Sequence, residues 1–141
     1  MLPDLNLLLY AVDAGSPRHD AARPWLEERL SGTEEIGLAW MTLIGFARLI
    51  TSQALLARPL SGSMALDVVD GWLARPQVVV LHPTDRHARI LRGLLQGVGT
   101  AGNLVTDAHL AALAIEHGAT LESSDHDFGR FAGLRWEDPL R

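Results

Sequence analysis

Short apolar segments alternate along this chain with longer stretches whose apolar residues recur at helical spacing. The apolar segments predict strands at residues 36–39, 78–81 and 119–123, a very short strand just before Asp4, and an edge strand in the tail 134–141. The helical stretches are residues 5–12, 17–30, 40–51, 61–74, 85–98 and 103–117. Because strands that alternate with helices form parallel sheets, this order predicts an α/β domain with a short, mainly parallel sheet. No linker or repeat interrupts the order, so we expect one domain over residues 1–141.

Two helix ends carry recognisable capping residues. Ser16 followed by Pro17 is typical of an N-cap and a first helical residue, so we expect a helix to begin there. Gly118 follows the stretch 103–117 and is expected to end that helix in a left-handed conformation. At the start of the same helix, Asn103 or Thr106 could serve as the cap.

Four aspartates lie within or at the ends of apolar segments: Asp4, Asp107, Asp125 and Asp127. Asp4 follows the first short strand, Asp107 lies in the first turn of a helix on the same face as Leu110, and the other two follow the strand at 119–123. If those strands are parallel neighbours, their acidic ends converge at one edge of the sheet. Carboxylates at the edge of a core are costly unless a positive partner meets them. A divalent cation is the simplest single partner for three or four of them.

Each of these aspartates also has an ordinary structural interpretation. Asp4 could be the N-cap of the helix that follows it, and Asp107 could be stabilised by the positive end of its own helix. Asp125 or Asp127 could cap a turn. Their joint occurrence is more informative than any one of them. His126 lies between two of the aspartates and could touch the site, whereas the other histidines show no ligand spacing.

Composition narrows the class of protein. The chain contains no cysteine, which excludes disulfides and thiolate zinc sites and suits a reducing cytoplasm. The N-terminal apolar run is interrupted by polar residues and is too short to span a bilayer, so we expect a soluble, cytoplasmic protein with no membrane partner. The net charge of −5 gives no overall attraction for nucleic acid, so RNA binding would need a local basic patch. All 12 basic residues are arginine, which suits bidentate phosphate recognition, although a GC-rich genome would produce the same bias.

A glycine-rich segment, residues 97–102, matches the pattern G-x-G-x-x-G letter by letter. That fingerprint of dinucleotide binding requires a strand before the glycines, and residues 86–96 have helical periodicity instead. We therefore interpret the segment as a flexible loop that delivers Asn103 and Asp107 to the site.

Several stretches together resemble the PIN-domain ribonucleases, in particular the VapC-type toxins of bacterial toxin–antitoxin pairs in the branch abundant in actinobacteria. The matching stretches are LPDLNLLLYA, WMTLIGFARLIT, GNLVTDAHLAALAIEHGATL and SSDHDFGRF, so the resemblance spans nearly the whole chain. It implies a three-layer α/β/α PIN-like domain, an acidic pocket that binds Mg²⁺ or Mn²⁺, and hydrolysis of an RNA phosphodiester bond. It also implies a cognate VapB-type antitoxin as a partner.

The same resemblance implies roles for individual residues. By motif match, Asp4 and Asp107 would be direct metal ligands, and Asp125 would be a further metal-binding acid of the pocket. Asp127 would orient water or close the pocket, which completes a catalytic set of four aspartates. The supporting polar groups would be Asn6 and Thr106.

One position departs from the family pattern. The family usually carries a glutamate within its third helix, and matching GFARLIT to that pattern places Gly45 there. No acidic residue occurs between Glu35 and Asp67, so a small shift of the match does not recover the carboxylate. The departure favours a rival hypothesis, a PIN-like module that binds RNA or a partner protein without cleavage. A different metal-dependent phosphohydrolase is a weaker alternative, because the sequence has neither a D-x-D-x-T motif nor a His-rich metal motif.

Apolar residues around Trp25, Trp40 and the mid-chain helices exceed what one small core requires. We expect part of this surface to pair with a second copy of the chain, forming a homodimer, or with an antitoxin segment. An antitoxin tail would then insert an arginine or apolar anchors near the acidic pocket.

Overall fold

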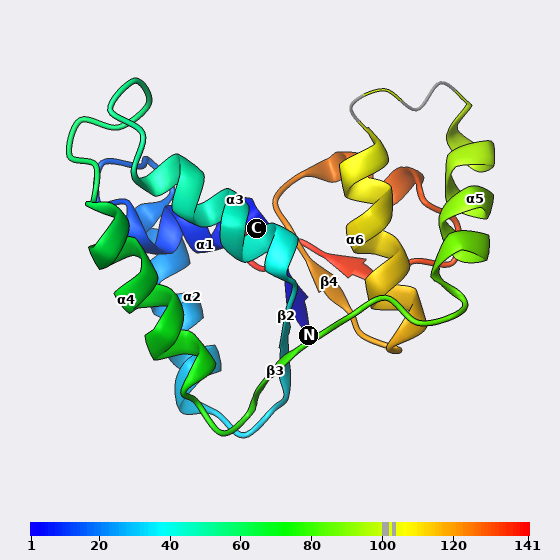
Figure 1. Cartoon of the computed structure of the whole chain (residues 1–141), viewed down its shortest axis with the longest axis horizontal. Coiled ribbons are helices and arrows are strands. Elements are labelled where there is room, and N and C mark those ends of the chain that lie inside the picture. The colour runs from blue at the N-terminus through cyan, green and yellow to red at the C-terminus, as the bar shows by residue number, and fades with distance from the viewer. Residues whose placement is uncertain (100–101, 103) are drawn as a thin grey trace.

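The computed structural model describes residues 1–99, 102 and 104–141. In chain order the elements are β1 (Leu2–Pro3), α1 (Leu5–Val12), α2 (His19–Ser31), β2 (Ile36–Leu38), α3 (Trp40–Ile50), α4 (Gly62–Leu73), β3 (Val78–Val80), α5 (His87–Val98), α6 (Leu104–Glu116), β4 (Leu121–Glu122), the 3₁₀ helix η1 (His126–Arg130) and β5 (Trp136–Glu137). The alternation of strands and helices expected from the apolar pattern is therefore present (Figure 1).

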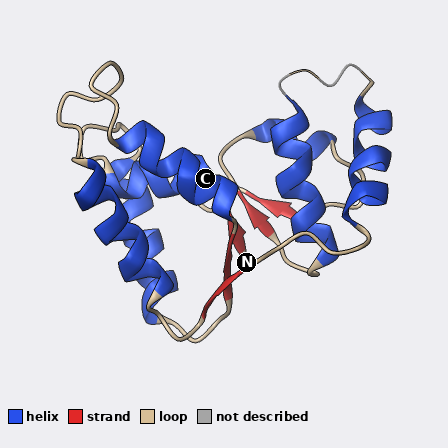
Figure 2. Ribbon diagram, viewed as in Figure 1, coloured by secondary structure: helices blue, strands red, loops and turns tan. Residues whose placement is uncertain are grey.

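Every strand pairing in the described residues is parallel. One sheet has the order β1-β4-β5, and β2 pairs with β3. The amide of Gly37 donates to the carbonyl of Met1 at 2.8 Å, so β2 lies beside β1 and the two sheets continue one another (Figure 2). The predicted short parallel sheet is confirmed, with β5 at its edge as expected for the tail.

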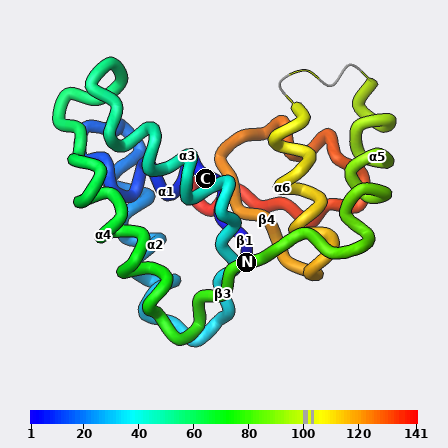
Figure 3. The backbone as a smooth tube through the Cα atoms, in the orientation of Figure 1, coloured from blue at the N-terminus to red at the C-terminus, as the bar shows by residue number. Residues whose placement is uncertain are grey.

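Helices cover the sheet from two sides and form two apolar clusters. The first cluster joins α1, α2, α3 and α4 through residues such as Leu7, Phe46 and Trp72. The second joins α5 and α6 through residues such as Leu94 and Leu113. The short strands lie between the two helical groups (Figures 1 and 3), which is the three-layer arrangement expected from the resemblance. The boundary between the clusters is where a cleft can open.

The start of α2 differs from its prediction. Ser16 and Pro17 lie in a turn, and the helix begins at His19 with Arg18 at the N-cap. The Ser16 hydroxyl accepts from the amide of Arg18 at 3.1 Å, two residues on, instead of capping the helix. Local closure of this turn delays the helix by two residues, because the hydroxyl is already used when the first helical amides need acceptors.

The predicted left-handed glycine at the C-terminal end of α6 is confirmed. Gly118 has φ of +63°, and the amide of Ala119 donates to the carbonyl of Ala114 at 2.8 Å, as in a left-handed helix cap. At the start, Thr100, Ala101 and Asn103 lie outside the described residues, so the expected capping by Asn103 and the expected loop that delivers it are not described. Within the described part of the chain, no helix is long and apolar enough to cross a bilayer.

Candidate active site and metal centre

A cleft of about 240 Å³ opens where the N-terminal ends of α1, α3 and α6 meet the segment after β4. Its lining residues are Asp4, Leu5, Asn6, Met41, Thr42, Thr106, Asp107, Leu110 and Asp125. Three aspartates that are far apart in sequence therefore share one small cleft. The helices reach it with their N-terminal ends, which carry the positive end of the helix dipole.

Asp4 is fixed by its position between β1 and α1. It is the N-cap of α1, and its Oδ1 accepts from the amide of Leu5 at 2.7 Å. Its amide donates to the carbonyl of Glu122 at 2.9 Å, which continues the pairing of β1 with β4. Its Oδ2 accepts from the hydroxyl of Ser123 at 2.8 Å. The two interpretations of Asp4 are therefore compatible, because the same carboxylate caps α1 and lines the cleft.

Ser123 connects two of the acids and was missed in the sequence. Its side chain is fully buried, donates to Asp4, and accepts from the amide of Asp125 at 2.9 Å. Asp125 in turn caps η1, since its Oδ1 accepts from the amide of Asp127 at 2.9 Å. The only signal in the sequence was the position of a serine directly after an apolar strand and two residues before an aspartate, which by itself is common.

The carboxylates repel one another across the cleft. The pKa of Asp107 is raised to about 6, chiefly by burial and further by the charges of Asp4, Asp125 and Asp127. Burial also raises the pKa of Asp4, against the hydrogen bonds from Ser123 and Leu5. Such a site gains from a bound cation, because the cation offsets both the burial of these charges and their repulsion, the two effects that raise the pKa values.

The donor set fits a hard divalent cation. Carboxylate oxygens are the ligands that Mg²⁺ prefers, and it usually retains several waters and uses only one or two protein carboxylates. Among the described residues, no three histidine or acidic side chains are already closed around a common metal position. An ion that keeps several waters could be held by Asp4, which Ser123 and Leu5 fix in place, together with the half-buried Asp107 or Asp125 of the same cleft.

The other predicted residues divide into two groups. Asn6 and Thr106 line the cleft beside Asp4 and Asp107. Asp127 is exposed on η1 and is not part of the lining, although its charge acts on Asp107. His126 is also exposed and contacts Asp138 at 3.4 Å, so it faces the C-terminal tail and not the cleft.

Gly45 lies on α3, one helical turn beyond the cleft residues Met41 and Thr42. A Cβ atom added there would come within 3.1 Å of Leu5 Cδ2, so α1 and α3 approach closely at this point. Because side chains on a helix lean toward its N-terminus, a longer side chain at position 45 would lean toward Met41 and the cleft. The position matched to the family glutamate is therefore at the edge of the acidic site.

A second polar network, between α5 and α6, was also missed. The buried carboxylate of Glu116 accepts from the amide and hydroxyl of Thr84 and contacts His87 Nδ1 at 2.5 Å. His87 Nε2 lies 2.9 Å from His109 Nδ1. Burial alone would raise the pKa of Glu116, but the hydrogen bonds from His87 and Thr84 hold it below its usual value. His109 and Glu116 are seven residues apart on one helix face, which was the available signal. The network joins two helices away from the cleft.

The family of the chain follows from its sequence. The family model described as the PIN domain matches residues 1–134. This chain belongs to the PIN-domain family, whose ribonucleases generally depend on a divalent metal.

Similar sequences carry a more specific name. The chain is 51% identical over 136 residues to Ribonuclease VapC37 of Mycobacterium tuberculosis, and the match covers 96% of this chain and 94% of that protein. It is 48% identical over 141 residues to Ribonuclease VapC33 of the same species, with 100% and 99% covered. The recognition of the family in the sequence is confirmed.

Solved structures share the fold at low sequence identity. One is VapBC2 from Rickettsia felis bound to a DNA fragment from its promoter, with a TM-score of 0.69, 20% identity and 96% of each chain covered. Another is VapBC-1 from nontypeable Haemophilus influenzae, with a TM-score of 0.66, 17% identity, and 99% of this chain and 98% of that chain covered. At this identity the likeness concerns the fold alone, and it confirms the expected architecture.

Proposed function

We propose that this protein is an endoribonuclease of the VapC type, the toxin of a toxin–antitoxin pair, and that residues 1–141 act as one catalytic domain. In this proposal Asp4, Asp107 and Asp125 bind Mg²⁺ or Mn²⁺, and RNA is the substrate. The names of the related sequences support the activity, and the geometry of the cleft supports the assignment of residues.

One observation carries the assignment. Asp4, Asp107 and Asp125 come from distant parts of the chain and line the same cleft, where burial and, to a smaller extent, the repulsion between these charges raise the pKa of Asp107 to about 6. A fold gains nothing in stability from such repulsion, so the arrangement is typical of a functional site.

Each residue then has a definite task. A bound divalent ion would supply charge stabilisation at the phosphate and a more acidic water. Asp4, fixed by Ser123 and Leu5, would be the rigid ligand, and Asp107 and Asp125 would be the further ligands of the same cleft. Asp127 at the rim would orient water. Asn6 and Thr106 would position the substrate or its water through their polar side chains, since both line the cleft.

Cleavage of a labelled RNA in Mg²⁺ or Mn²⁺ tests this proposal. We expect Asp4→Asn and Asp107→Asn each to lower the rate about a hundredfold or more, the loss seen when a group that stabilises transition-state charge is removed. Asp67→Asn is the matched control, because Asp67 is exposed on α4. Circular dichroism checks that all variants fold. Full activity of the wild type in EDTA, or unchanged activity of both cleft variants, would contradict the proposal.

A second candidate function is a PIN-like module that binds RNA or a partner protein without cleaving it. Gly45 favours this candidate, because α3 contributes no carboxylate to the cleft lining. The same assay separates the two: a wild-type protein that binds RNA but leaves it intact in both metals is the non-catalytic module.

Partners follow from the same proposal. Two of the solved structures that share the fold are VapBC2 and VapBC-1, which supports a VapB-type antitoxin as the protein partner. The apolar face of α3 formed by Trp40, Met41 and Ile44 is exposed and borders the cleft, which suits a homodimer contact or an antitoxin segment. Trp25 does not belong to this surface, contrary to expectation, because it is buried and its indole donates to Glu122 at 3.1 Å.

The chain has no cysteine, which supports action in the cytoplasm.

A further inference from the structure

Helix α5 has a charge unlike the rest of the chain. Residues 86–106 contain three of the 12 arginines, Arg86, Arg89 and Arg92, and none of the 17 acidic residues. The protein as a whole has a net charge of −5. Helix α5 with its N-cap therefore carries positive charge and no negative charge, on an acidic protein.

Two of these arginines are available for a ligand. Arg86 donates to the backbone carbonyl of Glu116 at 2.7 Å and serves the packing of α5 on α6. Arg89 and Arg92 are exposed, and no carboxylate of the described residues lies within salt-bridge distance of either one. They are three residues apart on the helix, so their guanidinium groups are neighbours on its surface.

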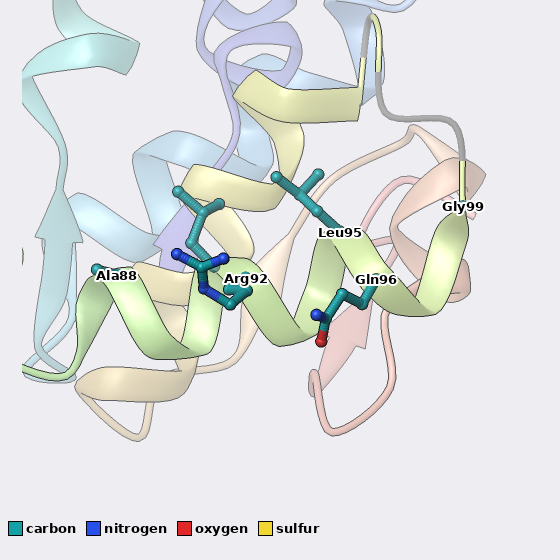
Figure 4. A pocket seen from close by; sticks show the side chains of 6 residues that line it. Ala88, Arg92, Leu95, Gln96 and Gly99 are labelled. Atoms are coloured by element: carbon teal, nitrogen blue, oxygen red, sulfur yellow. The ribbon is translucent and has the colours of Figure 1, made fainter.

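A trough of about 530 Å³ runs along the same helix. Its lining residues are Ala88, Leu91, Arg92, Leu95, Gln96 and Gly99. Ala88, Arg92 and Gln96 follow one another along the helix (Figure 4), and the half-buried Leu91 and Leu95 provide an apolar floor. The trough thus offers an apolar surface for a base, a cation for a phosphate, and an amide for the polar edge of a base.

One end of the trough lies at the same end of the α5–α6 pair as the acidic cleft. Helices α5 and α6 lie side by side in antiparallel directions, so the end of α5 at Val98 and the start of α6 are at the same end of the pair (Figure 1). Asp107 is in the first turn of α6. Gln96 and Gly99, at one end of the trough, are therefore at the same end of the helix pair as Asp107.

We propose that α5 is an RNA-docking surface, on which Arg89 and Arg92 bind backbone phosphates of the strand outside the acidic cleft and the Leu91–Leu95 floor receives a base. The inference rests on the proposed ribonuclease function and adds to it the surface that holds the substrate. The acidic cleft repels phosphate until a cation is bound, so the attraction that brings RNA to this protein must come from another surface. The planar fork of arginine matches a phosphate in a bidentate geometry, which favours a polyanion with regularly spaced phosphates.

The test measures binding separately from cleavage. The probe is a short fluorescein-labelled single-stranded RNA of mixed sequence, and its anisotropy is titrated with Asp107→Asn protein, which cannot cleave it under the proposed function. Adding Arg89→Gln and Arg92→Gln should weaken binding about tenfold for each arginine, as loss of one charge-assisted hydrogen bond does. The slope of log K against log salt should fall by about 1.4 in the double variant, at about 0.7 per phosphate contact on a single strand.

The matched control removes the same charge elsewhere. Arg23→Gln with Arg75→Gln changes two exposed arginines on the other helical group, and it should leave both the affinity and the salt slope close to those of the parent. With the catalytic aspartate intact, Arg89→Gln with Arg92→Gln should raise KM for RNA cleavage and leave kcat nearly unchanged, because these residues are away from the reacting bond.

The outcomes separate this inference from the proposed function. A wild type that never cleaves RNA, but binds it in a way that depends on Arg89 and Arg92, overturns the ribonuclease and supports the docking surface. A wild type that cleaves, together with unchanged affinity and slope in the double variant, overturns the docking surface alone. An equal loss in the control pair shows a bulk charge effect and overturns it as well. Unchanged RNA binding with lost binding of labelled poly-glutamate assigns α5 to an acidic protein and also overturns it.

Discussion

Asp107 shows how neighbours set the chemistry of a single residue. On its helix it is an ordinary first-turn aspartate, which the helix dipole would keep ionised. In the cleft, burial and the charges of Asp4, Asp125 and Asp127 outweigh the dipole and raise its pKa to about 6. A carboxyl whose pKa is higher in the folded state binds a proton more tightly there, so stability falls as pH rises from about 4 to about 6.

This pKa leads to a prediction for Asp107→Asn without metal. In EDTA at pH 7 the variant should be more stable than the wild type by about 1 kcal/mol, a value reduced from the full shift because the half-buried carboxyl is screened by solvent. The difference should shrink as pH falls from about 6 and vanish below about pH 4, where the wild-type carboxyl becomes protonated in the unfolded state as well. Urea unfolding across this pH range measures it. Added Mn²⁺ should stabilise the wild type and not the variant. A variant less stable than the wild type at pH 7 in EDTA would show that the carboxylates do not repel.

The close packing of α1 against α3 limits which side chains can replace Gly45. The two helices approach so closely that an added Cβ lies 3.1 Å from Leu5 Cδ2. A helical glycine costs about 0.5–1 kcal/mol relative to alanine, so Gly45→Ala gains that amount and loses part of it as Leu5 shifts. A side chain therefore fits at position 45 if Leu5 shifts slightly.

We predict that Gly45→Glu tightens Mn²⁺ binding about tenfold relative to Gly45→Ala. The glutamate leans toward Met41 and the cleft, where it adds the carboxylate that the family usually has in this helix. The alanine variant controls for the change in helix propensity and for the shift of Leu5. Isothermal titration of Mn²⁺ into both folded variants provides the comparison. Equal affinities would mean that position 45 does not reach the metal.

Viewed whole, the molecule has its acidic cleft at the junction of two helical groups and an exposed apolar face beside it. Trp40, Met41 and Ile44 on α3 are 46%, 43% and 59% exposed, and Met41 also lines the cleft. A partner docked on this face would therefore lie next to the acids. That position suits either a second subunit that completes the substrate groove or an antitoxin that blocks it.

We predict that Ile44→Arg converts a wild-type dimer into a monomer, because it places a charge in the centre of the apolar face. Leu55→Arg is the control, since Leu55 is 64% exposed in the segment between α3 and α4. Light scattering of the purified proteins gives the mass in solution. A monomeric wild type, or equal dissociation in both variants, would show that this face does not form the dimer.

The order of the elements could be predicted because hydrophobic periodicity is a local property of the chain. The family was also recognised in the sequence and is confirmed by the family match and the similar ribonucleases. Local reasoning failed where one hydroxyl had two possible partners: Ser16 closes its own turn, so α2 begins at His19 and not at Pro17. The candidate acids were named, and their roles remain predictions.

The sequence by itself determined which residues carry charge, where apolar stripes form strands and helices, and which motif family they resemble. Only the tertiary structure decided which charges meet. It brought Asp4, Asp107 and Asp125 into one cleft, left Asp127 on the rim, and placed Ser123 between two of the acids. It also buried Trp25 against Glu122 while Trp40 stayed exposed. The physical reason is that burial and electrostatic coupling depend on distances between segments remote in the chain, which no local pattern contains.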